Sequence, residues 1–248
     1  MTTPDCPPGR YLTLLAAGRD AASFLQGQLT QDVLTMEGLL PSALLTVQGR
    51  VLATPWVLAD ADSRRLLVAT GLADAVLQHL RRYVLRSKLT LSLAEPTETD
   101  REQLRAFVAQ RLAGANASSW PLALIRAGLA DVDVATSGEW IPQMINLDLI
   151  GAINFKKGCY TGQEIVARTQ HLGRIKRRMQ RYLGSGELPS PGSALRAGES
   201  KVGEVVAAAA DGAAVELLAV VNLDARSAAL TLADGRAFTS APLPYALD

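Results

Sequence analysis

The chain has 248 residues, of which 48% are hydrophobic and 20% are charged, a balance typical of an ordinary globular protein. Its formal net charge of +1 provides no overall field that would favour nucleic acid or an anionic membrane as a partner. The two cysteines, Cys6 and Cys159, are too few for the four thiolates that usually hold an iron–sulfur cluster, and they do not form a disulfide framework.

The first hundred residues alternate between strand-like and helix-like patterns. Apolar alternation predicts strands over residues 11–16, 42–48, 51–58, 65–70 and 88–93, and a helical period predicts helices over 21–34 and 72–85. Asp20 is expected to cap the first helix. The second and third strands would form a hairpin across Gly49 and Arg50, with Pro55 at an edge or a bulge. The order β-α-β-β-β-α-β is close to a ferredoxin-like split βαβ unit with one additional strand.

The middle of the chain is less regular. We expect residues 95–119 to be a linker that carries one helix, from about residue 101 to residue 112. Apolar residues resume at 120–128 and lead into 132–134, for which the pattern predicts a strand and a loop.

Short strand-like segments separated by glycines make up the rest of the chain. They lie at residues 181–183, 202–210, 215–222, 228–232 and 237–239. This pattern predicts a small antiparallel barrel or sandwich. The whole chain is therefore expected to be α+β with two domains, residues 1–178 and residues 179–248.

Residues 1–10 contain three prolines and no basic-then-apolar signal pattern. The most apolar stretch, residues 205–221, is interrupted by Asp211 and Glu216, so we expect no membrane-spanning segment and no membrane partner. With its unpaired cysteines, the protein is expected to be cytoplasmic.

The segment around Cys159 carries the strongest chemical pattern. Thr161 and Glu164 have capping-box spacing, which predicts a helix that begins near Gly162 and ends at Gly173. A thiol just before a helix N-terminus and beside lysines favours the thiolate. The alternative is a tight turn in which Cys159 is a small core residue.

The run from Lys157 to Glu164 reads Lys-Gly-Cys-Tyr-Thr-Gly-Gln-Glu and is followed by Lys176 after an eleven-residue gap. It resembles the signature of the YgfZ family, folate-binding proteins related to the T-protein (aminomethyltransferase) of the glycine-cleavage system. Further matching segments are residues 24–32, 48–50, 83–88, 137–143, 154–156 and 242–245. The resemblance covers most of the chain.

The resemblance implies a ferredoxin-like, folate-binding domain of the T-protein type followed by a C-terminal β-barrel. It implies that Cys159 is the functional thiol, with Lys157 beside it favouring the thiolate. The other motif residues are Gly158, Tyr160, Gly162, Gln163 and Glu164.

The resemblance also implies a tetrahydrofolate site. Asp32 resembles the T-protein aspartate that faces the folate, and Trp120 and Tyr11 occupy the positions of folate-contacting aromatic residues. Tyr11 stands where close relatives have tryptophan. From the residues alone, Asp32 also fits a solvated helix-end acid, and both aromatic residues also fit core packing.

Two features depart from the family pattern. Arg126 occupies the element in which the T-protein has a pterin-binding glutamate, and arginine is a donor only, so it would instead meet the glutamyl carboxylates of the folate. The shortened segment 95–119 replaces a larger subdomain, which leaves the wall of the folate cavity open to question.

A basic cluster follows the predicted cysteine helix. Its members are Arg168, Arg174, Lys176, Arg177, Arg178 and Arg181. It fits a solvated face, a site for the folate tail, or a site for RNA phosphates. His79 and His171 have no partner at metal-ligand spacing, so we expect no metal held by the chain alone.

Together these features favour a tetrahydrofolate-binding accessory protein that resembles YgfZ. The family supports the assembly or repair of iron–sulfur enzymes and, through them, the modification of some tRNAs, so the implied partners are folate and iron–sulfur client enzymes or assembly proteins. The alternatives are a folate-dependent aminomethyl or one-carbon transferase and an RNA-binding module. The sequence reveals no reaction of its own, which favours an accessory role over an enzyme.

Overall fold

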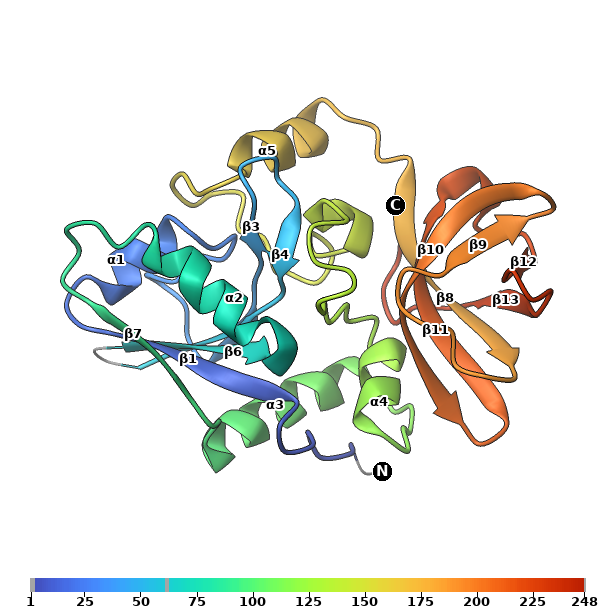
Figure 1. Cartoon of the computed structure of the whole chain (residues 1–248), viewed down its shortest axis with the longest axis horizontal. Coiled ribbons are helices and arrows are strands. Elements are labelled where there is room, and N and C mark those ends of the chain that lie inside the picture. The colour runs from blue at the N-terminus through green and yellow to red at the C-terminus, as the bar shows by residue number, and fades with distance from the viewer. Residues whose placement is uncertain (1–2, 61–62, 248) are drawn as a thin grey trace.

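A computed structural model describes residues 3–60 and 63–247 of the protein. In Figure 1 a layered α+β part, formed by the first two thirds of the chain, lies beside a β-barrel formed by the last third. Helix α4 (Trp120–Arg126) lies between the two parts and packs against the barrel strands β10 (Ser200–Asp211) and β11 (Ala214–Asn222).

A five-stranded antiparallel sheet forms the base of the α+β part, with strand order β2-β5-β6-β1-β7. Its strands are β1 (Tyr11–Ala17), β2 (Leu39–Pro41), β5 (Trp56–Ala59), β6 (Ser63–Ala69) and β7 (Thr90–Ala94). Helices α1 (Ala21–Gln26) and α2 (Thr70–Arg81) both contact β1 and β6. The arrangement confirms the predicted α+β class, although α2 ends four residues before the predicted end.

The predicted hairpin is present but short. Strands β3 (Leu44–Leu45) and β4 (Val51–Ala53) pair across a turn in which the Gly49 N–H donates to the Thr46 carbonyl at 2.9 Å. The predicted strand over 51–58 breaks in two, because β4 pairs with β3 while β5 joins the large sheet. The predicted strand over 42–48 shortens to β3, and β2 of the large sheet lies just before it. Pro55 lies at the break between β4 and β5.

The predicted helix over residues 21–34 is wrong in length, because α1 ends at Gln26. Beyond Gly27 the backbone bonds outside the helix: Leu29 forms a bridge with Leu44, and the Thr30 N–H donates to the Ala43 carbonyl. Asp20 does not cap α1, since its carboxylate accepts from the Lys88 N–H instead. Tertiary pairing overrides the apolar period of this segment.

Residues 95–119 contain helix α3 (Glu98–Arg111), which begins three residues earlier than predicted because Thr97 and Asp100 form a capping box. Leu104 and Val108 of α3 are fully buried, so this helix is part of the core. The strand predicted at 132–134 is absent: the Val132 N–H donates to the Thr54 hydroxyl, and the chain then turns.

The predicted C-terminal barrel is confirmed as a closed antiparallel barrel of order β10-β11-β8-β13-β12-β9. Besides β10 and β11 it contains β8 (Arg177–Ser185), β9 (Ala194–Ala197), β12 (Leu230–Thr231) and β13 (Ala237–Ala241). The predicted domain boundary after residue 178 falls inside β8, one residue after the strand begins. Strand β9 was not predicted.

Three further helices complete the described fold. They are the 3₁₀ helices η1 (Pro142–Ile145) and η2 (Leu223–Ala225) and the α-helix α5 (Gln163–His171). Within the described residues, no helix combines the length and the apolarity needed to cross a membrane.

Candidate functional site

Cys159 lies on an exposed loop that leads into α5. Its side chain is exposed, while Lys157, two residues before it, and Tyr160, directly after it, are buried. The helix begins at Gln163 as predicted, but the predicted capping box does not form, since no side chain caps α5. Instead the Gln163 side-chain oxygen accepts from the Tyr160 N–H at 3.1 Å.

Two glycines allow the cysteine loop to approach the β3–β4 hairpin, which reaches toward α5 in Figure 1. Gly162 has a φ of +81°, and a Cβ there would lie 2.5 Å from the Thr46 carbonyl oxygen. Gly49 has a φ of +71°, and a Cβ there would lie 2.7 Å from the Cβ of Ile165. Only glycine fits either position without displacing its neighbour.

Lys157 points inward and holds the segment that follows α1. Its Nζ donates to the carbonyls of Gln26, Leu29 and Gln31, each at 2.7 Å. Burial lowers the pKa of Lys157 to about 8, although the charge of Asp32 opposes this shift. The ring of Tyr160 lies 5.1 Å from Nζ, within cation–π range. The structure therefore directs this ammonium at backbone carbonyls.

Asp32 lies on the segment that Lys157 holds. Its Oδ1 accepts from the Gln26 side-chain amide at 3.0 Å and from the Leu34 N–H at 3.1 Å. Burial raises the pKa of Asp32, but hydrogen bonds from Leu34, Thr35 and Gln26 outweigh that effect and lower it overall. This carboxylate is therefore ionised at neutral pH and available as an acceptor.

Further hydrogen bonds fasten the cysteine loop to the Asp32 segment. The Thr161 N–H donates to the Gly27 carbonyl at 3.1 Å, and the Asn154 N–H donates to the Thr30 carbonyl at 3.0 Å. The Thr30 hydroxyl donates to the Ala152 carbonyl at 2.7 Å. The cysteine loop (residues 151–162) and the Asp32 segment (residues 26–32) are thus one hydrogen-bonded unit.

The remaining motif residues have separate roles. Gly158 is exposed, and a Cβ there would meet nothing within 4 Å. Glu164 is exposed and pairs with Arg168 one turn along α5. The Cys159 thiol is therefore exposed to solvent on a loop that several hydrogen bonds hold in place. A partner in solution can reach it.

The predicted aromatic pair is brought together but is buried. The Trp120 Nε1–H donates to the Tyr11 hydroxyl at 3.4 Å, and the Tyr11 hydroxyl donates to Asp131 Oδ2 at 2.8 Å. Burial, followed by the charge of Asp131, raises the pKa of Tyr11 well above its usual value, so it remains a donor. In this structure the rings form part of the core, and among the described residues no hydrogen bond joins Asp32 to either of them.

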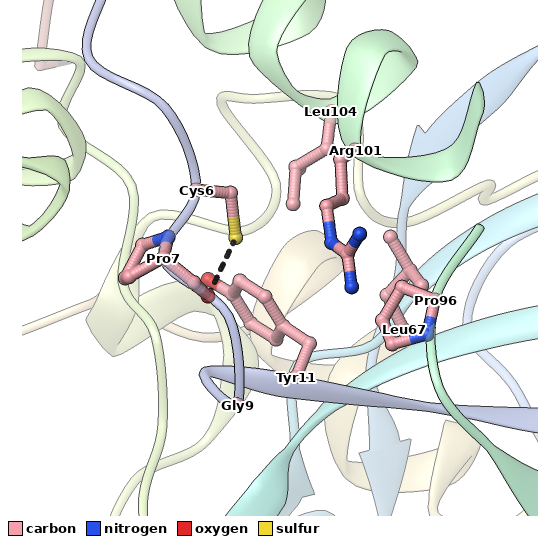
Figure 2. Close-up of a pocket in the computed structure, with 8 residues that line it drawn as sticks. All are labelled: Cys6, Pro7, Gly9, Tyr11, Leu67, Pro96, Arg101 and Leu104. Atoms are coloured by element: carbon pink, nitrogen blue, oxygen red, sulfur yellow. Dashed lines mark hydrogen bonds between the residues drawn. The ribbon is translucent and has the colours of Figure 1, made fainter. Parts of the chain in front are cut away.

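Cys6 and Tyr11 line the same small pocket, as Figure 2 shows. Its Sγ points to the Pro7 carbonyl at 3.9 Å, and Arg101 and Leu104 of α3 line the same small pocket. Burial raises the pKa of Cys6 to about 11. The two cysteines therefore differ sharply: Cys6 is a buried thiol, and Cys159 is an exposed one.

A larger cleft opens between α4 and β10, with a volume of about 360 Å³. We call it the α4–β10 cleft. Its lining residues include Arg10, Leu124, Asp131, Asp133, Leu188 and Val206. It lies beside the aromatic pair, since Arg10 precedes Tyr11 and Leu124 is one helical turn from Trp120.

Arg126 does not face open solvent as a free cation. Its guanidinium pairs with Glu216 at 2.6 Å and with Asp211 at 2.5 Å, both on the barrel. Arg181 pairs with the other oxygen of Glu216 at 2.7 Å. The expected contact of Arg126 with folate carboxylates would have to compete with these ion pairs.

Several members of the predicted basic cluster form ion pairs with acidic residues of the same chain. Arg178 is buried and makes a bidentate pair with Asp148, with two distances of 2.8 Å. Arg177 pairs with Glu204, and Arg168 pairs with Glu164. Arg174 and Lys176 remain exposed, so the cluster offers far less positive surface than the sequence suggests.

The described residues contain no group of three or more histidine, cysteine, aspartate or glutamate side chains that could hold a metal ion. Sequence reasoning missed Arg10, Asp131 and Asp148. The available signal was an aspartate between apolar neighbours, as at Asp131 between Ala130 and Val132, because a buried carboxylate requires a partner.

No protein-family model matches the chain. In an alignment 292 positions long, the chain is 27% identical to the tRNA-modifying protein YgfZ of Shigella dysenteriae serotype 1, covering 93% of this chain and 90% of that protein. It is 28% identical over 293 residues to the protein of the same name from Escherichia coli O7:K1, with the same coverage. Among solved structures it resembles glycine cleavage system aminomethyltransferase T from Bartonella henselae, with a TM-score of 0.70 and 13% identity over 95% of this chain and 84% of that one.

The structural likeness shows that the chain has the aminomethyltransferase T-protein fold, with its α+β part followed by a barrel. The near-complete coverage by sequence relatives, taken with this fold, supports assignment of the chain to the YgfZ family, as the cysteine motif predicts.

Proposed function

We propose that this protein is a tetrahydrofolate-binding accessory protein that supports the assembly or repair of iron–sulfur enzymes and, through them, tRNA modification. The observation that carries the proposal is the exposed Cys159 thiol, held on a loop that is hydrogen-bonded to the Asp32 segment. The relatives named as tRNA-modifying proteins and the T-protein fold support the same direction.

The cysteine loop has the properties of a site that delivers or accepts a group. An exposed thiol on a rigid loop can bind a metal, carry a persulfide or react with an oxidant. The chain cannot hold a cluster with thiolates alone, so a partner must supply the other ligands. These are properties of an accessory factor that acts on client proteins.

The T-protein fold also favours a second candidate, a folate-dependent aminomethyl or one-carbon transferase. Such a transfer requires no thiol, and the Arg126 guanidinium is engaged by Glu216 and Asp211. A glycine-cleavage assay with a lipoyl protein separates the candidates: turnover would support the transferase, and its absence with retained folate binding supports the accessory role.

Folate binding can be measured through tryptophan fluorescence. All three tryptophans are buried, so Trp56→Phe with Trp140→Phe leaves Trp120 as the single reporter in the core beside the α4–β10 cleft. We expect tetrahydrofolate to change the Trp120 emission with a saturable dependence on ligand concentration. If the protein shows no binding at millimolar tetrahydrofolate, by fluorescence and by calorimetry, the proposed function is wrong.

A further inference from the structure

The α4–β10 cleft contains an ion pair that the predicted site residues do not include. Its walls are mostly apolar, formed by leucine, proline, valine and alanine side chains, and its charged lining groups are Arg10, Asp131 and Asp133. A volume of about 360 Å³ suits a small molecule rather than a macromolecular segment.

Among the described residues, only one of the two carboxylate oxygens of Asp131 has hydrogen-bond donors. Asp131 Oδ2 accepts from Arg10 Nε at 3.0 Å, from Arg10 Nη2, and from the Tyr11 hydroxyl. Within the described chain, no hydrogen bond involves Asp131 Oδ1 or Arg10 Nη1. The Asp131 side chain is 6% exposed and that of Arg10 is 36% exposed. Asp131 Oδ1 therefore remains as an open acceptor, and Arg10 Nη1 keeps open N–H donors, on two paired side chains that line the cleft.

The buried aromatic pair makes this arrangement rigid. Tyr11 donates to Asp131, and Trp120 donates to Tyr11, so the carboxylate is held from behind. Removal of a carboxylate from water costs free energy unless its remaining acceptor sites are satisfied. A ligand that offers a donor to Asp131 and an acceptor to Arg10 would satisfy both open positions.

The charges in the cleft argue against an anionic ligand. Arg10 is neutralised by Asp131, and Asp133 adds a further negative charge at the lining. A phosphate or carboxylate would meet this net negative charge, whereas a neutral heterocycle would not. The apolar walls favour a flat ring that buries both of its faces.

We propose that the α4–β10 cleft binds a planar heterocycle by its cyclic amide edge, with Asp131 accepting from the ring N–H and Arg10 donating to the ring carbonyl. If the proposed function holds, this ring is the pterin of tetrahydrofolate, which carries such an edge. Tyr11 and Trp120 are then positioning residues that act through Asp131 and do not stack on the ligand.

Three ligands and two variants test the assignment in the full-length chain. The ligands are tetrahydrofolate, a reduced pterin without the benzoylglutamate tail, and p-aminobenzoylglutamate without the pterin. Asp131→Asn replaces one carboxylate oxygen with an NH2 group, which cannot accept from the ring N–H. We expect it to weaken the binding of both pterin ligands at least tenfold. Asp74 is exposed on α2 and does not line the cleft, so Asp74→Asn is the matched control and should bind as the wild type does.

A second variant guards against a fold effect of Asp131→Asn. Ala207 lines the cleft on β10 and is half-buried, so Ala207→Phe fills the cleft without removing a polar contact. Ala210 lies on the same strand, is exposed and does not line the cleft, so Ala210→Phe is its control. We expect Ala207→Phe to abolish binding of the reduced pterin and Ala210→Phe to leave it unchanged.

The outcomes separate this site from the proposed function. Tetrahydrofolate that binds the wild type, Asp131→Asn and Ala207→Phe equally well would overturn the cleft assignment and leave the proposed function standing. A reduced pterin that binds in an Asp131-dependent way, without binding of tetrahydrofolate, would support the cleft and contradict the proposed function. If neither tetrahydrofolate nor the reduced pterin binds, both the cleft assignment and the proposed function are wrong.

Discussion

At the residue scale, Lys157 shows how a charged motif residue can serve the loop rather than the thiol. Its ammonium bonds three backbone carbonyls that would otherwise lack those partners. Buried polar groups without partners cost about 1–3 kcal/mol each. We infer that the role of Lys157 in the motif is to hold the Asp32 segment against the cysteine loop.

The depressed pKa of Lys157 predicts a specific pH dependence of stability. Below pH 8 both the folded and the unfolded chain carry the proton, and between about pH 8 and the ordinary value of 10.5 the unfolded chain binds more protons. The free energy of unfolding contributed by Lys157 therefore rises with pH across this window, by at most about 3 kcal/mol.

Urea unfolding of the wild type and of Lys157→Met at pH 7, 8, 9 and 10 measures this contribution. The difference between the two proteins should shift in favour of the wild type as the pH rises above 8, because other titrating groups are common to both. Parallel stability curves for the two proteins across this range would contradict the lowered pKa.

At the scale of elements, the start of α5 depends on a glycine rather than on a side-chain cap. Gly162→Ala would place a Cβ against the Thr46 carbonyl at a positive φ, so we expect a loss of about 2–4 kcal/mol in the free energy of unfolding. Gly158→Ala is the control from the same motif, since a Cβ there meets open space, and its effect should stay within about 0.5 kcal/mol. Equal effects of the two substitutions in urea unfolding would refute this account.

The same region shows where sequence patterns stop being informative. The position of α5 was predictable from the apolar residues that follow Gly162, whereas the capping box of Thr161 and Glu164 was not formed. Here the backbone turns in the left-handed region and Gln163 supplies the bond to Tyr160. Likewise α1 stops at Gln26 because residues 29–31 bond to the hairpin and to the cysteine loop, partners that no local pattern reveals.

At the scale of the whole molecule, a buried ion pair joins the barrel to the α+β part. Arg178 on β8 and Asp148 are only 6% and 7% exposed, and Arg178 also donates to the Gln143 carbonyl. Asp148→Ala leaves a buried guanidinium unpaired and should cost about 3–5 kcal/mol in urea unfolding. Glu164→Ala removes an exposed pair with Arg168 and should cost less than about 1 kcal/mol. A small effect of Asp148→Ala would mean that the barrel is held by apolar packing alone.

The overall architecture was predictable because strand and helix periods and a specific motif mark it in the sequence. The α4–β10 cleft was not, because its ion pair joins Arg10 to Asp131 across 121 residues of chain. The ion pairs of the basic cluster could not be predicted for the same reason: the acidic partners Asp148, Glu204 and Glu216 come from other parts of the chain.

The central claim is that the exposed Cys159 thiol carries the function in a folate-binding frame. It is tested most directly in cells that lack the protein, by mass spectrometry of a tRNA modification that depends on an iron–sulfur enzyme. Wild type and Cys6→Ser should restore the modified nucleoside, because the Cys6 thiol is buried and unreactive. Cys159→Ser should fold and bind tetrahydrofolate as the wild type does but fail to restore the modification, whereas full restoration by Cys159→Ser would contradict the account.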